Sequence, residues 1–310
     1  MIRKAIDRLV RGRDLEEEEA RLSMREIMSG RATDAQIASF LTALRLKGET
    51  AREISAMASE MRVFCRSVCP KVRGRLVDTC GTGGDRIKTF NVSTAAALVV
   101  AGAGIPVAKH GNRSVTSSCG SADVLEQLGL NLKLDPGEVE RLIERVGIGF
   151  MFAPIFHPAM KYAAGPRREI GIRTVFNILG PLTNPARVGG QVLGVYSEDL
   201  LQRIAPALVE LGCKEAMVVH GEGGIDEFSI VGPTTVARVK DGEVAWLTVK
   251  PRDLGLETAR QEEIEGSGPK ESADLLFRLV SGLLGDDDAR MRMLLMNAAA
   301  GIVVGGRADS

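Results

Sequence analysis

The stretch DTCGTGGDRIKTFNVST, residues 78–94, joins a short apolar run to the helical pattern AAALVV, and its three glycines fall within four positions. Glycine lets backbone approach a ligand closely or turn sharply. Neither of two familiar phosphate motifs fits, because no Gly-Lys-Ser/Thr follows and Arg86 stands where the dinucleotide motif has its third glycine. Two interpretations therefore stay open: a tight turn, or a phosphate cradle completed by the Ser- and Thr-lined start of the helix.

A second stretch has the same character. KHGNRSVTS, residues 109–117, also leaves a strand candidate and enters a helical segment, ADVLEQLG. Lys109 and Arg113 supply positive charge and the hydroxyls supply donors, although a surface loop with ordinary basic residues has the same composition. Two strand-to-helix loops of this kind favour a ligand with more than one phosphate.

Two further stretches carry charged candidates. Asp226 and Glu227 lie in a glycine-rich loop, where adjacent carboxylates either hold a hard divalent cation that shares phosphate oxygens or are simply solvated. RREIGIRTVFNILGPLTNP, residues 167–185, begins with two arginines. Their guanidinium groups can bind a carboxylate in bidentate fashion, or pair with nearby acidic residues.

Hydrophobic periodicity divides the chain into two parts. Up to about residue 70 the pattern is helical, with apolar positions of residues 2–10 on one face and capping boxes at Thr33 and Thr50. Beyond it, strand candidates alternate with helical segments, which predicts a mostly parallel sheet with crossover helices. The strand candidates are 75–79, 105–109, 191–196 and 216–220, the helical segments are 94–102, 122–128, 198–211 and 270–284, and a hairpin is expected over 236–249. The predicted fold class is α/β, with a small helical domain over residues 1–70 and a larger α/β domain over 71–310.

Composition excludes some classes of function. The 310 residues include 40 Lys plus Arg and 40 Asp plus Glu, and this zero net charge argues against a dedicated nucleic-acid binder. Five cysteines and three histidines form no zinc-site spacing, which favours reduced thiols in a cytoplasmic protein. No apolar run is long enough to span a bilayer. We therefore expect a cytoplasmic protein with neither nucleic acid nor membrane as a partner.

Together these stretches resemble the anthranilate phosphoribosyltransferase family along nearly the whole chain. Pyrimidine nucleoside phosphorylases share related glycine and Lys-containing loops, so these loops alone do not distinguish the two families. The long motif ending at Pro185, with Asp226-Glu227 downstream, favours the transferase family. The matching motifs are QIASFLTALRLKGET (36–50), GTGGD (81–85), NVST (91–94), KHGNRSV (109–115), GSADVLEQLG (120–129), HPAMK (157–161) and REIGIRTVFNILGPLTNP (168–185).

The resemblance implies transfer of phosphoribose from phosphoribosyl pyrophosphate to the amine of anthranilate, in tryptophan biosynthesis. It also implies two magnesium ions, and a homodimer joined through the helical domain, to which later helices contribute. Anthranilate would contact Gly81, Asn112 and Arg167, with His110 and His157 close by. Ser93, Asp226 and Glu227 would hold magnesium. The positions implied for the phosphoribosyl donor are Gly81, Gly84, Asp85, Thr89, Asn91, Val92, Ser93, Thr94, Lys109, His110, Gly111, Asn112, Arg113, Ser114, Val115, Thr116, Ser117 and Ser121.

Two departures from the family pattern carry expectations of their own. Ser118-Cys119 stands where many members have a basic residue followed by Ser, which removes one positive charge near the phosphate loop. Members usually continue beyond GRADS through another helical segment, so we expect exposed core near residues 302–304.

Catalysis is expected to rest on positioning and charge neutralisation, without a dedicated general base, because the aromatic amine of anthranilate is neutral at pH 7. Two other classes stay open as alternatives. A phosphorylase of the same architecture would need no pyrophosphate-bound magnesium, and a noncatalytic nucleic-acid-binding relative would show a basic excess. The Asp226-Glu227 pair speaks against the first and the zero net charge against the second.

Overall fold

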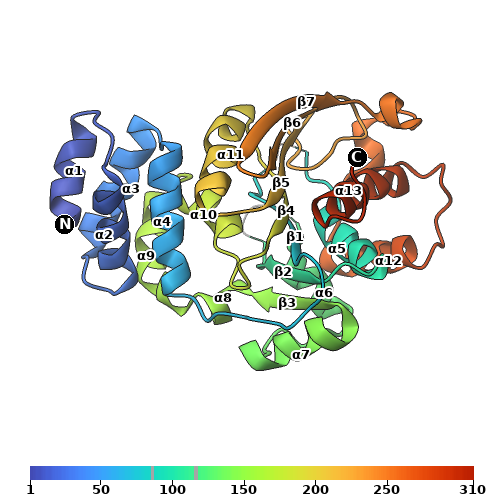
Figure 1. The fold of residues 1–310 in the computed structure, drawn as a ribbon, viewed down its shortest axis with the longest axis horizontal. Helices are drawn as coiled ribbons and strands as arrows, with labels where there is room; N and C mark the ends of the chain where they lie inside the picture. The colour runs from blue at the N-terminus through green and yellow to red at the C-terminus, as the bar shows by residue number, and fades with distance from the viewer. Residues whose placement is uncertain (85–86, 115–117) are drawn as a thin grey trace.

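The computed structural model describes residues 1–84, 87–114 and 118–310, and its first four helices stand together at one end of the molecule (Figure 1). Both predicted capping boxes are confirmed. The hydroxyl of Thr33 accepts a hydrogen bond from the Gln36 amide, and that of Thr50 accepts one from the Glu53 amide. In return, the side chains of Gln36 and Glu53 accept hydrogen bonds from the backbone amides of Thr33 and Thr50. The four helices are α1 (Ile2–Val10), α2 (Glu17–Met28), α3 (Asp34–Lys47) and α4 (Ala51–Val63).

The chain returns to this helical part after its third strand. Helix α9 packs against α3 and α2, and its Ala163 is buried in the same core cluster as Met24 and Phe40. This return places loops of the α/β part beside α4. The returning elements are α8 (Ala153–Phe156), a 3-10 turn (Pro158–Met160), α9 (Lys161–Ile170) and α10 (Phe176–Leu182).

A seven-stranded sheet forms the centre of the larger part, with strand order β3-β2-β1-β4-β5-β6-β7. The first five strands are parallel, and β6 and β7 form an antiparallel hairpin turning at Asp241-Gly242, as expected from the sequence. The mostly parallel sheet confirms the predicted fold class. The strands are β1 (Val77–Gly81), β2 (Val107–Gly111), β3 (Ile148–Phe152), β4 (Gly190–Gly194), β5 (Glu215–Gly221), β6 (Thr234–Lys240) and β7 (Glu243–Val249).

Helices cover both faces of the sheet. Val192 and Val219 point into a core shared with α5, α12 and α13, whereas the neighbouring Leu193 and Val218 point into a core shared with α11. Burial on both faces is typical of parallel strands. These helices, with two that flank β3, are α5 (Val92–Gly102), α6 (Ser121–Gln127), α7 (Pro136–Val146), α11 (Leu201–Glu210), α12 (Pro269–Val280) and α13 (Ala289–Val304).

Three expectations from the sequence need correction. Strand β3 and helix α7 were not predicted, because the five residues of β3 include a glycine and become a strand only by pairing with β2. Two of the predicted strands begin two residues later than expected, at Val77 and Val107. Val303 and Val304 are buried rather than exposed, because the end of α13 packs on the sheet and Arg75 donates to the Val304 carbonyl. Among the described residues, every helix is too short or too polar to cross a bilayer.

Candidate active site

Two adjoining cavities lie where the carboxyl ends of the parallel strands face the helical part. The loop cavity, about 380 Å³, is lined by the glycine loop after β1, the start of α5, the loop after β2 and the carboxylates after β5. The histidine cavity, about 460 Å³, is lined by α9, α10, the turn after β3 and Met61 of α4. Their common wall consists of His110, Asn112, Arg167, Phe176 and Gly180. A ligand in one cavity therefore lies beside a ligand in the other.

The glycine loop is shaped by its contacts with Asp226. A Cβ atom on Gly81 would lie 2.3 Å from Asp226 Oδ2, so a side chain at this position would displace the carboxylate. The same oxygen accepts a 2.8 Å hydrogen bond from the Gly83 amide. Gly84 has φ +78°, which other residues rarely adopt, and its carbonyl accepts a 2.6 Å bond from Arg173. Asp85, a predicted donor contact, lies outside the described residues.

The start of α5 faces the loop cavity. Val92, Ser93 and Thr94 line it, and the helix N-terminus favours bound anions. The side chain of Asn91 donates to the Cys119 carbonyl at 3.1 Å, which ties this turn to the second loop. Thr89 also lines the cavity. The Ser93 and Thr94 amides already donate to Glu227 and to the Asn91 carbonyl, so this segment offers a phosphate its hydroxyl groups and the positive end of the helix dipole.

Two buried residues of opposite charge type, Lys109 and Asp78, lie beneath the loop cavity. Lys109 reaches from β2 to donate to the Thr79 carbonyl at 2.7 Å, and its ammonium lies 3.4 Å from the Ser93 hydroxyl. Asp78 is fully buried, and burial raises its pKa to about 6 although the charge of Lys109 opposes that rise. Asn184 donates to Asp78 at 2.8 Å. The ammonium of Lys109 is thus fixed at the cavity floor, where it can attract a phosphate.

The loop after β2 is held by acidic side chains of α6. Arg113 forms ion pairs with Asp123 and Glu126, at 2.9 and 2.8 Å, so its charge is directed toward α6. The Ser121 hydroxyl donates to the Asn112 carbonyl at 3.3 Å. The Gly111, Asn112, Arg113, Ser114 and Ser121 positions all line the loop cavity. The predicted donor contacts Val115, Thr116 and Ser117 lie outside the described residues.

The two carboxylates after β5 suit a magnesium ion that shares its ligands with phosphate. Asp226 and Glu227 are each 7% exposed, and Glu227 accepts from the Ser93 amide at 3.2 Å. Burial raises the pKa of Asp226, which a bound cation would reverse. Within the described ranges no three His, Cys, Asp or Glu residues cluster as a complete protein cage. Two adjacent carboxylates on the wall of a cavity that Ser93 also lines fit Mg²⁺, which usually keeps waters and takes substrate phosphates as ligands.

Helix α13 holds this acidic loop in place. Asn297, 2% exposed, accepts from the Phe228 amide at 2.9 Å and donates to the Phe228 carbonyl at 3.0 Å. The backbone after Glu227 is therefore fixed by a residue about seventy positions further along the chain. Sequence reasoning missed Asn297, since nothing in a methionine-rich helical pattern indicates which backbone its amide will reach.

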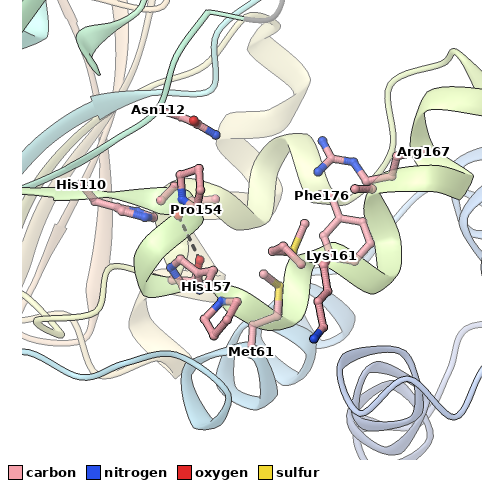
Figure 2. Close-up of a pocket in the computed structure, with 14 residues that line it drawn as sticks. Met61, His110, Asn112, Pro154, His157, Lys161, Arg167 and Phe176 are labelled. Atoms are coloured by element: carbon pink, nitrogen blue, oxygen red, sulfur yellow. Dashed lines mark hydrogen bonds between the residues drawn. The ribbon is translucent and has the colours of Figure 1, made fainter. Parts of the chain in front are cut away.

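The histidine cavity contains two neutral imidazoles. The rings of His110 and His157 lie 5.0 Å apart between centroids, and burial lowers their pKa values to about 3 and about 4. Figure 2 shows the two rings beside Pro154 on one side of the cavity. Both rings are therefore uncharged near neutral pH, and each has a buried nitrogen, Nε2, that forms no hydrogen bond within the described residues.

Arg167 and Lys161 are the cations that line this cavity, and the Lys161 ammonium lies 4.9 Å from the Tyr162 ring centroid. Arg167 is the half-buried one of the two. Its guanidinium lies 5.2 Å from the Phe176 ring centroid, and Figure 2 shows it pointing across the cavity toward Asn112. It forms no ion pair with any acidic residue that the structure describes. Burial lowers the pKa of Arg167, which indicates a charge partly removed from water. A flat aromatic carboxylate suits this arrangement, since Arg binds carboxylates in a bidentate manner and stacks well.

Apart from the residues outside the described ranges, the predicted site residues thus gather around the two cavities. His220, interpreted as structural, bonds the Val195 carbonyl and lines neither cavity. Cys80 and Cys119, interpreted as packing residues, are buried. Met61, Asp78, Phe176 and Arg173 were not predicted as site residues; only Arg173 and Phe176 carried a signal, since both lie within the quoted 167–185 stretch.

Comparisons with known proteins cover both parts of the chain. The glycosyl transferase family model for a helical bundle domain matches residues 3–65, and the model for an a/b domain of that family matches residues 73–310. Anthranilate phosphoribosyltransferase of Desulforamulus reducens is 54% identical, over 99% of this chain and 88% of that protein. The enzyme of the same name from Methanopyrus kandleri is 51% identical, over 98% and 91%.

Solved structures agree with these relatives. Anthranilate phosphoribosyltransferase from Thermus thermophilus superposes with a TM-score of 0.93 at 43% identity, covering 99% of this chain and 90% of that one. The Saccharomyces cerevisiae enzyme in complex with PRPP and Mg gives 0.90 at 31%, over 99% and 89%. The same yeast enzyme in complex with 4-fluoroanthranilate gives 0.88 at 30%, over 99% and 88%.

Proposed function

This chain belongs to the anthranilate phosphoribosyltransferase family, and on that premise we propose how its residues divide the work of the reaction. Phosphoribose is transferred from phosphoribosyl pyrophosphate to the amine of anthranilate, as a step in tryptophan biosynthesis. The amine nitrogen forms a bond to C1 of the ribose, the bond from C1 to pyrophosphate breaks, and the nitrogen loses one proton. The protein must therefore bind a highly charged donor and a flat acceptor side by side.

The loop cavity takes the donor. The glycine loop and the positive N-terminal end of α5 surround its phosphates, and the ammonium of Lys109 lies beneath them. Ser93, Asp226 and Glu227 hold magnesium, and we infer two ions because a pyrophosphate offers oxygens to more than one. When bound, magnesium neutralises charge that builds on the departing pyrophosphate. Fixed donors aimed at developing charge are worth far more in such a site than in water.

The histidine cavity takes anthranilate. The observation that carries this proposal is Arg167, an unpaired and half-buried guanidinium among the described residues, set across a cavity from Asn112 and beside two neutral imidazoles. The carboxylate of anthranilate pairs with Arg167, and its ring lies toward the wall shared with the loop cavity. The neutral His110 and His157 accept hydrogen bonds without adding charge that would compete with Arg167.

No residue serves as a dedicated general base in this proposal. Anthranilate's amine is neutral and nucleophilic at pH 7, and its nitrogen becomes strongly acidic only after it bonds to C1. Water can then remove the proton. Most of the barrier is lowered by holding the amine against C1 and by stabilising the leaving group.

We also propose that two copies of the chain associate through the helical part, in the cytoplasm. Val10 and Leu46 are exposed apolar residues near the ends of α1 and α3, which pack against each other. A second copy of the chain packed against these helix ends would bury both side chains. Sedimentation velocity of the wild type should show a dimer, and Leu46→Asp should shift it toward monomer; a monomeric wild type would overturn this proposal.

The reaction is tested by the fluorescence of anthranilate. Protein, phosphoribosyl pyrophosphate and magnesium together should cause the fluorescence to decay, and EDTA should prevent the decay. Release of free base from a pyrimidine nucleoside in the presence of inorganic phosphate tests the phosphorylase alternative. Decay of fluorescence that needs no magnesium would contradict the roles given to Asp226 and Glu227, and absence of decay in folded protein would contradict the reaction itself.

A further inference from the structure

A third cavity, about 290 Å³, lies where the end of α4 meets the ends of α10 and α11. It borders the amino end of β4, whereas the loop cavity lies at the carboxyl ends of the strands. Its polar side chains include three cations, Arg62, Arg187 and Lys214, which come from three separate segments. Nothing in the reaction above uses this cavity.

The three cations have no acidic counterpart. Within residues 1–84, 87–114 and 118–310, none of them forms an ion pair. The guanidinium of Arg62 donates to the Leu182 carbonyl at 2.9 Å and, more weakly, to the Leu211 carbonyl at 3.4 Å. These carbonyls satisfy hydrogens of Arg62 but do not cancel its full charge. Burial and the nearby Arg187 both lower the pKa of Arg62, so positive charge is concentrated here.

Apart from Arg167 at the proposed anthranilate site, the other half-buried arginines of the described chain have acidic partners. Arg75 and Arg238 share Glu215, at 2.7 and 2.6 Å, and Arg203 pairs with Glu49 at 3.0 Å. Burying a charge without a partner is unfavourable, so chains usually supply one. At the third cavity this argument applies to the half-buried Arg62, since Arg187 and Lys214 are exposed, and the partner that Arg62 lacks in the described chain can come from solution.

Arg187 stands at this cavity in an uncommon backbone conformation. Its φ is +47°, in the left-handed region that favours glycine or asparagine. Its amide donates to the Asn184 carbonyl at 3.0 Å, which closes the turn that carries it. The turn therefore places a cationic residue at this cavity where glycine or asparagine would be less strained.

We propose that this third cavity binds a phosphate group, free or as the phosphomonoester of a small organic molecule. Three converging cations suit a multiply charged tetrahedral oxyanion, since Arg and Lys both bind phosphate well. The volume exceeds what one phosphate group needs, and Leu208 and Leu211 on the wall can contact an organic portion. Arg62 joins α4 to the ends of α10 and α11, so the bound anion also strengthens the junction between the two parts.

The first test is binding of inorganic phosphate, measured by equilibrium dialysis and by thermal unfolding without magnesium. The double variant Arg187→Gln/Lys214→Gln removes two exposed cations of the cavity. The matched control Arg145→Gln/Lys240→Gln removes two exposed, unpaired cations that line none of the three cavities and changes net charge equally. The active site binds phosphate in all three proteins, so only the difference between the variants reports on the third cavity.

We expect the wild type and the control to bind one more phosphate per chain than the double variant, or to bind at that site about tenfold more tightly. Both should also show a larger rise in unfolding temperature on adding phosphate, since a ligand of the native state stabilises it. Glycerol 2-phosphate in place of phosphate distinguishes a phosphomonoester from the free ion by its relative affinity. Equal stoichiometry and affinity in all three proteins would overturn the proposal.

A second test locates the anion directly. Crystals of the wild type soaked in selenate should show an anomalous peak beside Arg62, and crystals of the double variant should lack it. A peak in the wild type without any difference in solution binding would mean an adventitious ion only, and it would overturn the proposal. Magnesium-dependent loss of anthranilate fluorescence is measured on the same proteins, so failure of the proposed function is distinguished from failure of this site.

Discussion

The loop cavity and the histidine cavity share a wall, but the charged groups around them differ. Around the loop cavity, buried carboxylates, the ammonium of Lys109 and backbone amides form a connected network. Around the histidine cavity, the two buried titratable rings are neutral, and the cations Arg167 and Lys161 have no acidic partner in the described chain. A polyanion bound with metal requires the first arrangement, and a flat monoanion requires the second.

This difference teaches where each half of the site comes from. The loop cavity is built mainly from segments that follow the carboxyl ends of strands, which the parallel fold brings together. The histidine cavity depends on α9 and α10, and on Met61 from the helical part. The donor half is thus a property of the α/β part, whereas the acceptor half exists only because the chain crosses between the two parts. Four substitutions test this contrast.

The largest effect is expected from Asp226→Asn. It removes a negative charge from the proposed magnesium site while keeping the size of the side chain. Turnover at limiting magnesium should fall about 100-fold or more, and excess magnesium should restore part of it. Steady-state rates across a magnesium titration provide the measurement, with Asp274→Asn on the exposed face of α12 as the matched control. Unchanged rates at limiting magnesium would remove Asp226 from the metal site.

Arg167→Gln should weaken binding in the histidine cavity and leave binding in the loop cavity nearly unchanged. The KM for anthranilate should rise about 30-fold, because the carboxylate loses its charged partner, while the KM for the donor changes little. Arg168→Gln is the matched control, since Arg168 is exposed and lines neither cavity. A rise in the donor KM alone would show that Arg167 belongs to the loop cavity.

Asn297→Leu should make the loop that carries Asp226 and Glu227 less rigid. Losing both bonds to Phe228 leaves a buried amide and carbonyl without partners, so the magnesium concentration for half-maximal rate should rise about tenfold. Asn297→Asp keeps an acceptor for the Phe228 amide and should show a smaller change. An altered anthranilate KM with an unaltered magnesium requirement would contradict this role.

The smallest effect concerns His157 and the pH dependence of stability. Its pKa is about 4 in the folded protein and about 6.5 in an unfolded chain, so below pH 6.5 only the unfolded state takes up its proton. Stability from the neutral ring is therefore present above pH 6.5 and is lost as pH falls toward 4. Between pH 7 and 5.5 the wild type should lose about 1 kcal/mol more unfolding free energy than His157→Asn. Urea unfolding at both pH values measures this, and equal losses would mean that the ring is charged when folded.

Some features of this molecule could be predicted from short stretches of sequence. The capping boxes at Thr33 and Thr50, the hairpin at Asp241-Gly242 and the alternation of strands and helices depend on residues close together in the chain. The glycine loop and the Asp226-Glu227 pair were also identifiable, because their chemistry lies in consecutive residues. Strand β3 was not, since its strand character depends on pairing with β2.

By itself, then, the sequence determined the fold class, the strand-to-helix loops and the residue types available to bind phosphate, metal and carboxylate. Only the tertiary structure decided that His110 and His157 are neutral, that Asn297 holds the acidic loop and that Met61 lines the acceptor cavity. It also turned Arg113 toward α6 rather than leaving it free. The reason is physical: burial and long-range hydrogen bonds set protonation and orientation, and both depend on which distant segments pack together.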